Sequence, residues 1–564
     1  MTNPYLSIQI SSLRNQAWLF DDRSGSFELT GYTSQPGSAH DPQTMIRALQ
    51  ELEKNTGRQI LTSSNTLLFR ENEGTEGLEG AGITFSAGKP IRTALIGLSE
   101  KFSLEPLRRL VSFFNSEIVL EINLQNEPNI SSQIEKLTNT GFDLLVLAGG
   151  INGGPERALR AAISNLRLLG QLYPVERPQI IYAGNQALAD HVRLELEIGD
   201  DLHIAGNIQP ESGREDLSFA YKAIHKAILR IRMKEFPALQ QLANEPKVNI
   251  FPVEFARTRM GTWLEQTQAS EKGILQIHLE PESGQVVANR NGKCMGLWEN
   301  LKVDKDAIEA VAGVLRKSVN QTVTAAYMLN KQIHPSFLPA TLEELSIEIA
   351  WIGIRIKKML LRLSELDPDF HYDPDLGLQD DYEPVLLSGA TLDRLPSFRH
   401  AFIPVLDSVL PNGVTTFAWD DFEVMAALGA LAEFNSLLSA QVVDSDIFTN
   451  IATVVVVDSL ATTGQVVLRL EVDEGTGDAR QRYKVYAQEL KRIESASGND
   501  IRVYLSPEEN SDVGMGVRGL GGWVITPASR LGIIVDARGR PLQLPADIQT
   551  MQETRQQWHW ELGV

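Results

Sequence analysis

The chain has almost no cysteine and a shortage of positive charge. Cys294 is the only cysteine in 564 residues, which excludes internal disulfides and multi-cysteine metal sites. Against 72 aspartates and glutamates there are 52 lysines and arginines, which leaves a formal net charge of −20. So acidic a surface repels phosphate backbones, and we therefore expect no nucleic-acid partner.

We also expect no targeting or membrane-spanning segment. The first residues, Met1 to Tyr5, lack the basic and apolar regions of a signal peptide. The longest apolar runs, such as Ala452 to Val457, are only as long as a strand. The sequence therefore predicts a cytoplasmic protein that does not enter a membrane.

Common catalytic patterns are absent as well. The sequence has no Gly-x-Ser-x-Gly elbow, no Cys–His nucleophile arrangement and no histidine pair at the i, i+4 spacing of a helical metal site. We therefore assign no catalytic and no metal-binding residue. An acidic stretch without lysine or arginine fits no EF-hand, and we expect a solvated loop rather than a Ca²⁺ site, with a basic partner as a further possibility. Its members are Glu365, Asp367, Asp369, Asp373, Asp375, Asp380, Asp381 and Glu383.

The most informative segment that is present covers residues 143–170. An apolar run from Leu144 to Leu147 indicates a buried strand, and Pro155 and Gly170 suit the first position and the C-terminal cap of a helix. The glycines between them permit positive φ angles and close approach of a ligand. A small anion at the helix N-terminus is one interpretation, and a tight turn kept for packing is the other. The residues predicted to bind are Gly149, Gly150, Asn152, Gly153, Gly154 and, after the next strand, Asn185.

Strands and helices alternate from residue 91 to about 236, which predicts a doubly wound parallel sheet. Asp41 is expected to cap an early helix, and Thr341 with Glu344 forms a capping box that opens a long helix ending near Leu366. An alanine-rich stretch, residues 420–438, predicts one further helix. Strands dominate from residue 451 onward.

Several motifs together resemble the glutamate mutase L family, also written MutL or GlmL, which is unrelated to the mismatch-repair protein that shares the first name. The strongest are Leu147-Ala-Gly-Gly-Ile-Asn-Gly-Gly154 and Ile181-Tyr-Ala-Gly-Asn185. Further matches occupy residues 86–92, 417–431, 512–516 and 535–542.

The family is similar to the actin, Hsp70 and sugar-kinase superfamily. The resemblance implies an α/β fold in which two ribonuclease-H-like domains form a clasp around ATP and Mg²⁺. It implies a first actin-like subdomain at 1–90, an inserted doubly wound domain at 91–245, a second actin-like subdomain at 246–449 and a β-rich C-terminal domain at 450–564. Ser388 and Gly389, within Leu387-Ser-Gly-Ala390, retain part of the family's adenosine-side motif.

Both expected phosphate loops are degenerate. The family's first loop reads like Ile-Asp-Ile-Gly-Ser-Thr-x-Thr, whereas residues 8–15 place Gln9 at the aspartate and Ser11 at the glycine. In the second loop His278 replaces the aspartate, and Glu280-Pro281 replaces the glycine pair. Glu280 and Glu282 bring negative charge toward a triphosphate, and Pro281 removes an N–H donor. We therefore expect neither an ATP–Mg²⁺ cofactor nor ATP hydrolysis.

These features favour a non-enzymatic accessory, chaperone-like or scaffold protein over an enzyme. By resemblance, its partner is expected to be a mutase-like enzyme or a paralogue with intact loops. Two alternatives stay open: a regulator that binds a small molecule in the inserted domain, and an ATPase or kinase with divergent phosphate loops.

Overall fold

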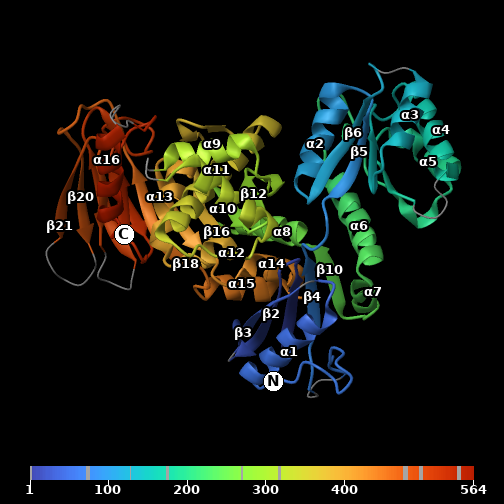
Figure 1. Cartoon of the computed structure of the whole chain (residues 1–564), viewed down its shortest axis with the longest axis horizontal. Helices are drawn as coiled ribbons and strands as arrows, with labels where there is room; N and C mark the ends of the chain where they lie inside the picture. Colours follow the sequence, from blue (N-terminus) through green and yellow to red (C-terminus); the bar gives the residue numbers. More distant parts are fainter. Residues whose placement is uncertain are drawn as a thin grey trace. The chain divides into compact units, whose positions relative to one another are not determined.

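The chain forms two compact units, which are described separately. A computed structural model describes residues 3–563 apart from 24, 38, 72–75, 127–128, 173–176, 269–270, 316–318, 474–479, 495–499 and 543–547. Unit 1 contains residues 1–260 and 425–445, and unit 2 contains residues 261–424 and 446–564. Figure 1 labels their helices and strands.

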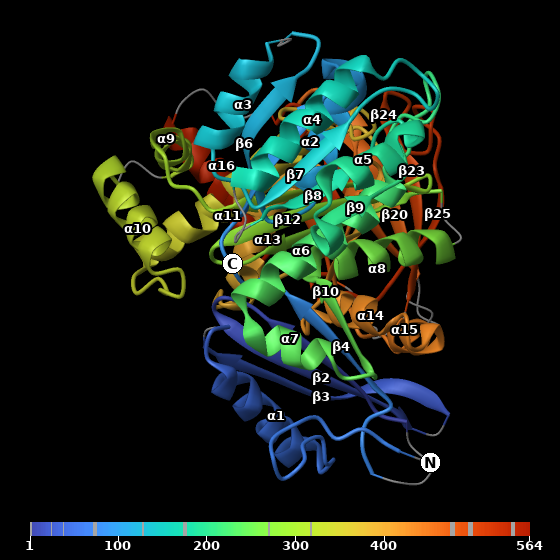
Figure 2. The ribbon, with the colours of Figure 1, turned by 90° about the vertical axis from the view of Figure 1, so that its right-hand side faces the viewer.

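Unit 1 begins with a mixed five-stranded sheet in the order β10-β4-β1-β2-β3. Its first three strands form an antiparallel meander, and β4 and β10 run parallel to β1. Helix α1 (Pro42–Thr56) lies along β2 and β3 (Figure 2), and Asp41 caps it as predicted. The strands are β1 (Tyr5–Ile10), β2 (Arg14–Arg23), β3 (Ser26–Pro36), β4 (Gly80–Phe85) and β10 (Val248–Pro252).

The second sheet of unit 1 is entirely parallel and has the order β6-β5-β7-β8-β9. Helices α3, α4 and α5 cover one face, and α2 and α6 cover the other (Figure 1). This arrangement confirms the predicted doubly wound sheet. Its strands are β5 (Ile91–Gly97), β6 (Ser116–Asn123), β7 (Leu144–Ala148), β8 (Gln179–Tyr182) and β9 (Leu202–Ile204), and its helices are α2 (Glu105–Ser112), α3 (Ile130–Asn139), α4 (Arg157–Leu172), α5 (Ala189–Leu196) and α6 (Ser218–Glu235).

A late segment of the chain completes unit 1. Helices α14 (Val424–Leu431) and α15 (Ser436–Asp444) pack against the first sheet. The Phe434 ring lies over Gly80, and Ala430 lies over Gly82, so closely that a Cβ atom on either glycine would collide. These two strand glycines therefore let the helical segment approach the backbone of β4.

Unit 2 repeats the topology of the first sheet. In its eight-stranded sheet, of order β13-β12-β11-β16-β17-β18-β26-β22, β11 to β13 form a meander and β16 and β17 run parallel to β11. One such sheet in each unit confirms the expected pair of ribonuclease-H-like folds. The strands are β11 (Gly273–Leu279), β12 (Ser283–Arg290), β13 (Lys293–Asn300), β16 (Tyr382–Ser388), β17 (Val414–Trp419), β18 (Thr449–Val456), β22 (Leu490–Ile493) and β26 (Ile533–Asp536).

The remaining elements of unit 2 include a four-stranded antiparallel sheet, so the region after 450 is β-rich as predicted. The four domain boundaries themselves stay a prediction. The sheet contains β20 (Val466–Asp473), β21 (Gln481–Tyr486), β23 (Ile501–Pro507) and β25 (Gly522–Thr526), and the principal helices are α9 (Lys305–Val314), α10 (Gln321–Ile333), α11 (Leu342–Leu366), α13 (Phe398–Val409) and α16 (Ile548–Glu561). Among the described helices, none is long and apolar enough to cross a bilayer.

Two predicted helices differ from those in the structure: the one after the glycine loop and the one at residues 420–438. The Glu156 carbonyl accepts the first helical hydrogen bond of α4, from the Arg160 N–H, so Pro155 lies outside the helix. The helix then continues through Gly170, at the modest cost of an interior glycine. Residues 420–438 do not form one helix, because Asn435 ends the first part by capping α15 through the N–H groups of Leu437 and Leu438.

Candidate functional site

The tip of the β1–β2 hairpin, the first expected phosphate loop, satisfies its own backbone. The Ser11 N–H donates to the Arg14 carbonyl at 3.1 Å, and the Arg14 N–H donates to Ser11 Oγ at 3.1 Å. Gln9, at the expected aspartate position, is buried and donates to Gln16 Oε1 at 3.3 Å. The tip thus uses two of its own N–H groups internally, and Gln9 supplies no charge for Mg²⁺.

The β11–β12 hairpin confirms the strand–turn–strand expected for the second loop, but its turn presents carbonyl oxygens to an arginine. The Glu280 N–H donates to the Ser283 carbonyl at 2.9 Å. Arg355 of α11 donates from Nη2 to the carbonyls of Glu280, at 2.9 Å, and Ser283, at 2.6 Å. Burial lowers the pKa of Arg355, and the nearby carboxylates of Glu348, Glu299 and Glu280 oppose that shift. The turn is built around a protein cation instead of a phosphate.

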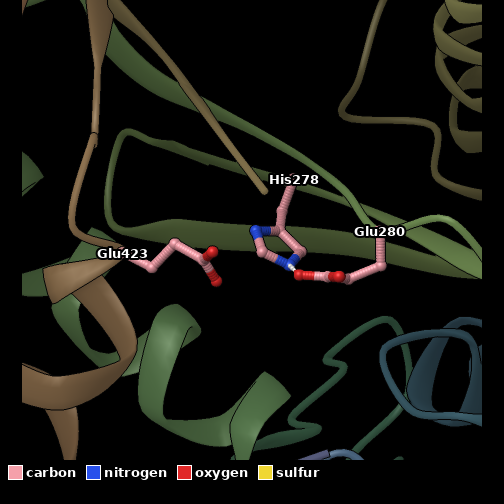
Figure 3. A group of neighbouring side chains, drawn as sticks. All are labelled: His278, Glu280 and Glu423. Carbon is pink, nitrogen blue, oxygen red and sulfur yellow. Dashed lines mark ion pairs between the residues drawn. The ribbon is translucent and has the colours of Figure 1, made fainter. Parts of the chain in front are cut away.

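His278 and Glu280 of this hairpin meet a third titratable side chain, Glu423. Figure 3 shows the two carboxylates on either side of the imidazole ring. His278 Nε2 lies 3.2 Å from Glu280 Oε1, and one ligand atom from each of the three residues lies within 4.8 Å of the other two. The His278 and Glu280 side chains are 5% and 15% exposed, and Glu423 is 2% exposed. The three groups form a buried cluster of two carboxylates and one imidazole.

The predicted residues Ser388 and Gly389 lie beside this cluster. Ser388 is paired with His278 across the parallel strands β16 and β11, and its Oγ lies 2.9 Å from His278 Nδ1. Gly389 has a φ of +106°, and a Cβ there would collide with the backbone of Leu279. The structure therefore brings the expected adenosine-side motif to the second hairpin, where its hydroxyl orients His278. A role in binding a nucleotide stays a prediction.

Glu423 was not predicted as a site residue. It follows β17 and has a φ of +53°, which is unusual for a glutamate. The turn before it is closed by Asp420, whose carbonyl accepts from the Glu423 N–H at 3.1 Å and whose Oδ1 accepts from the Val424 N–H at 2.8 Å. Glu423 lies within the family match at residues 417–431, but that match gives no sign of its proximity to His278, which arises from the pairing of β11, β16 and β17.

The glycine loop of the inserted sheet is bonded to its neighbours. Asn185 Oδ1 accepts from the N–H groups of Gly153 and Ala187, each at 3.0 Å. Asn207 Nδ2 donates to the Gly150 carbonyl and to Asn152 Oδ1, each at 2.9 Å. The structure thus joins the two predicted segments, the loops after β7 and β8.

Packing also explains two of the loop's glycines. Gly149 has a φ of +143°, and a Cβ there would collide with Leu98. Gly154 has no positive φ, but a Cβ there would lie only 3.0 Å from the Ile151 side chain and 3.1 Å from the Ile151 carbonyl oxygen. These contacts favour the packing interpretation, while anion binding at Gly149, Gly150, Asn152, Gly153, Gly154 and Asn185 stays a prediction.

The acidic stretch contacts basic side chains from β12, from β13 and from its own loop. Lys293 contacts Asp369 at 2.6 Å, and Arg290 and His371 contact Asp380 at 2.7 and 2.9 Å. The N–H groups of Leu376 and Asp375 lower the pKa of Asp373. The loop is therefore less purely solvated than the sequence indicated.

The residues of both hairpins do not fit a bound ATP–Mg²⁺. The first tip consumes its own donors, and the second carries two glutamates and Pro281 around an arginine. Two ribonuclease-H-like sheets define a protein of the actin-like class, here with altered hairpins. The family described as MutL protein matches residues 5–278 of this chain.

Known relatives are distant. Protein MutL of Clostridium tetanomorphum is 23% identical over 206 residues, which cover 34% of this chain and 43% of that protein. An ATP-dependent caprolactamase from Pseudomonas jessenii is 10% identical, with 85% of this chain and 81% of that chain covered and a TM-score of 0.31. A xylulose kinase from Bifidobacterium adolescentis is 12% identical, with 80% and 96% covered and a TM-score of 0.26. Structural likeness at these scores carries no argument about this chain.

Proposed function

We propose that the chain is a non-catalytic accessory protein of the glutamate mutase L type that does not hydrolyse ATP. The observation that carries the proposal is the state of both hairpin tips. The N–H groups of Ser11, Arg14 and Glu280 already have protein partners, and Glu280 and Glu282 add charge of the wrong sign for a triphosphate. A fold that keeps both sheets but lacks both phosphate cradles suits protein contacts better than phosphoryl chemistry.

Calorimetry with Mg²⁺ and ATP, combined with a phosphate-release assay, tests this proposal. We expect no saturable heat at micromolar nucleotide and no release above the buffer rate. Micromolar binding with turnover that is lost in His278→Gln and kept in His371→Gln would instead establish an ATPase with divergent loops. His371 is a suitable control because it lies in the same unit on an exposed acidic loop.

The proposed partner is a mutase-like enzyme or a paralogue with intact phosphate loops. The match of residues 5–278 to the family described as MutL protein supports a protein partner of this kind. Pull-down from native extract with the full chain, followed by mass spectrometry, should recover one of these two proteins in stoichiometric amount. Recovery of neither contradicts the assignment of the partner.

The regulator alternative predicts a ligand for the glycine loop. A small anion at 100 times its Kd should stabilise unit 1 by about 2.7 kcal/mol. A thermal-shift screen of small anionic metabolites measures this effect, with Asn185→Ala as the variant that should lose it. The internal hydrogen bonds of the loop lead us to expect no shift.

A further inference from the structure

The cluster around His278 has the composition and spacing of a metal site. Imidazole nitrogen and carboxylate oxygen are ligands of first-row divalent metals. Ligands of a tetrahedral zinc ion, at 2.0–2.2 Å from the metal, stand about 3.3 Å apart. His278 Nε2 and Glu280 Oε1 are 3.2 Å apart, close to that spacing. One ligand atom from each of His278, Glu280 and Glu423 lies within 4.8 Å of the other two, so Glu423 needs a side-chain movement to complete the set.

The second observation is the hydrogen bond between Ser388 Oγ and His278 Nδ1. Metal-binding histidines almost always use their other ring nitrogen in such a bond, which fixes the ring and the tautomer. Here the other ring nitrogen, Nε2, faces Glu280, and the Glu423 carboxylate lies on the opposite side of the ring (Figure 3). The ring is therefore already fixed with Nε2 beside one carboxylate before any metal arrives.

We propose that His278, Glu280 and Glu423 bind a divalent first-row transition metal, for which zinc is the best match. An imidazole ligand favours zinc over Mg²⁺ or Ca²⁺, which prefer oxygen ligands throughout. Three protein ligands leave a fourth position for water or for a donor from a partner protein. The site lies at the hairpin expected for the second phosphate loop, but zinc binding measured without nucleotide tests it independently of ATP hydrolysis.

Titration of the metal-free full chain with ZnCl₂, followed by calorimetry, tests the proposal. We expect about one equivalent bound, with affinity lowered at least about 100-fold in His278→Gln and Glu423→Gln. Removing only the orienting hydroxyl, in Ser388→Ala, should lower the affinity by about 10–100-fold. His371→Gln, which alters the exposed pair with Asp380, should bind zinc like the unaltered chain.

Absorption of the Co²⁺-loaded unaltered chain supplies a readout that does not depend on a variant folding. A visible spectrum typical of tetrahedral cobalt at one equivalent, displaced by zinc, supports the site. The proposal is overturned if no such spectrum appears, or if His278→Gln and Glu423→Gln, both with an unaltered circular dichroism spectrum, bind zinc as the unaltered chain does.

Discussion

Replacing Arg355 should loosen the β11–β12 hairpin without unfolding the chain. In Arg355→Met the alkyl stem is kept, and the two hydrogen bonds to the Glu280 and Ser283 carbonyls are lost. Hydrogen bonds from a charged donor contribute about 1.5–3 kcal/mol each, so we expect a local loss of at least about 3 kcal/mol. A loss of this size raises the population of the locally open hairpin about 100-fold.

Hydrogen–deuterium exchange of peptides covering residues 277–287 is the appropriate assay, because a chain of two units does not unfold in a single transition. Arg362→Met is the matched control. It lies two turns further along α11, is 54% exposed and makes only a 3.4 Å contact with Glu299, so its loss should cost less than about 1 kcal/mol. Equal exchange in the two variants would refute the role we give to Arg355.

Two further predictions concern buried charges. Burial lowers the pKa of His225 to about 4 in folded unit 1. In the unfolded chain the imidazole binds a proton at higher pH, near its ordinary pKa of about 6.5, so folding stability is lost as the pH falls from about 6.5 towards 4. Between pH 7 and pH 5 the loss should be about 2 kcal/mol, and melting curves of His225→Phe should show less of it. In unit 2, Asp536→Asn deprives buried Arg538 of a main partner and should cost about 3–5 kcal/mol, whereas exposed Asp458→Asn should leave the melting temperature unchanged within a degree or two.

Local sequence signals predicted the fold well where they were strong. The capping box at Thr341 and Glu344 formed as expected, with the Glu344 N–H donating to Thr341 Oγ1, and its helix ends at Leu366. The alternation after residue 91 predicted the parallel sheet, whose central strands β5, β7 and β8 are buried along almost their whole length. Asn435 was a signal that was present but not used, since an asparagine before Ser436 is a common helix N-cap.

The candidate site was only partly accessible from the sequence. Alignment located the β11–β12 hairpin and Ser388, because strand–turn–strand motifs are local. The sequence identified His278 and Glu280 as replacements that disfavour phosphate binding. It did not show that both side chains lie beside Glu423. Glu423 joins them through the pairing of three strands that are far apart in the chain, and periodicity carries no trace of such a contact.

The late segment that covers Gly80 and Gly82 has a consequence for synthesis of the protein. About 185 residues separate Met260 from Ser445, so a ribosome working at about 5–20 residues per second needs about 10–40 s to supply that segment after the rest of unit 1 has been made. During this interval the face of β4 that awaits Phe434 and Ala430 has no cover. A nascent chain of this design depends on a chaperone, or on slow early folding, to keep that apolar face from binding the wrong partner.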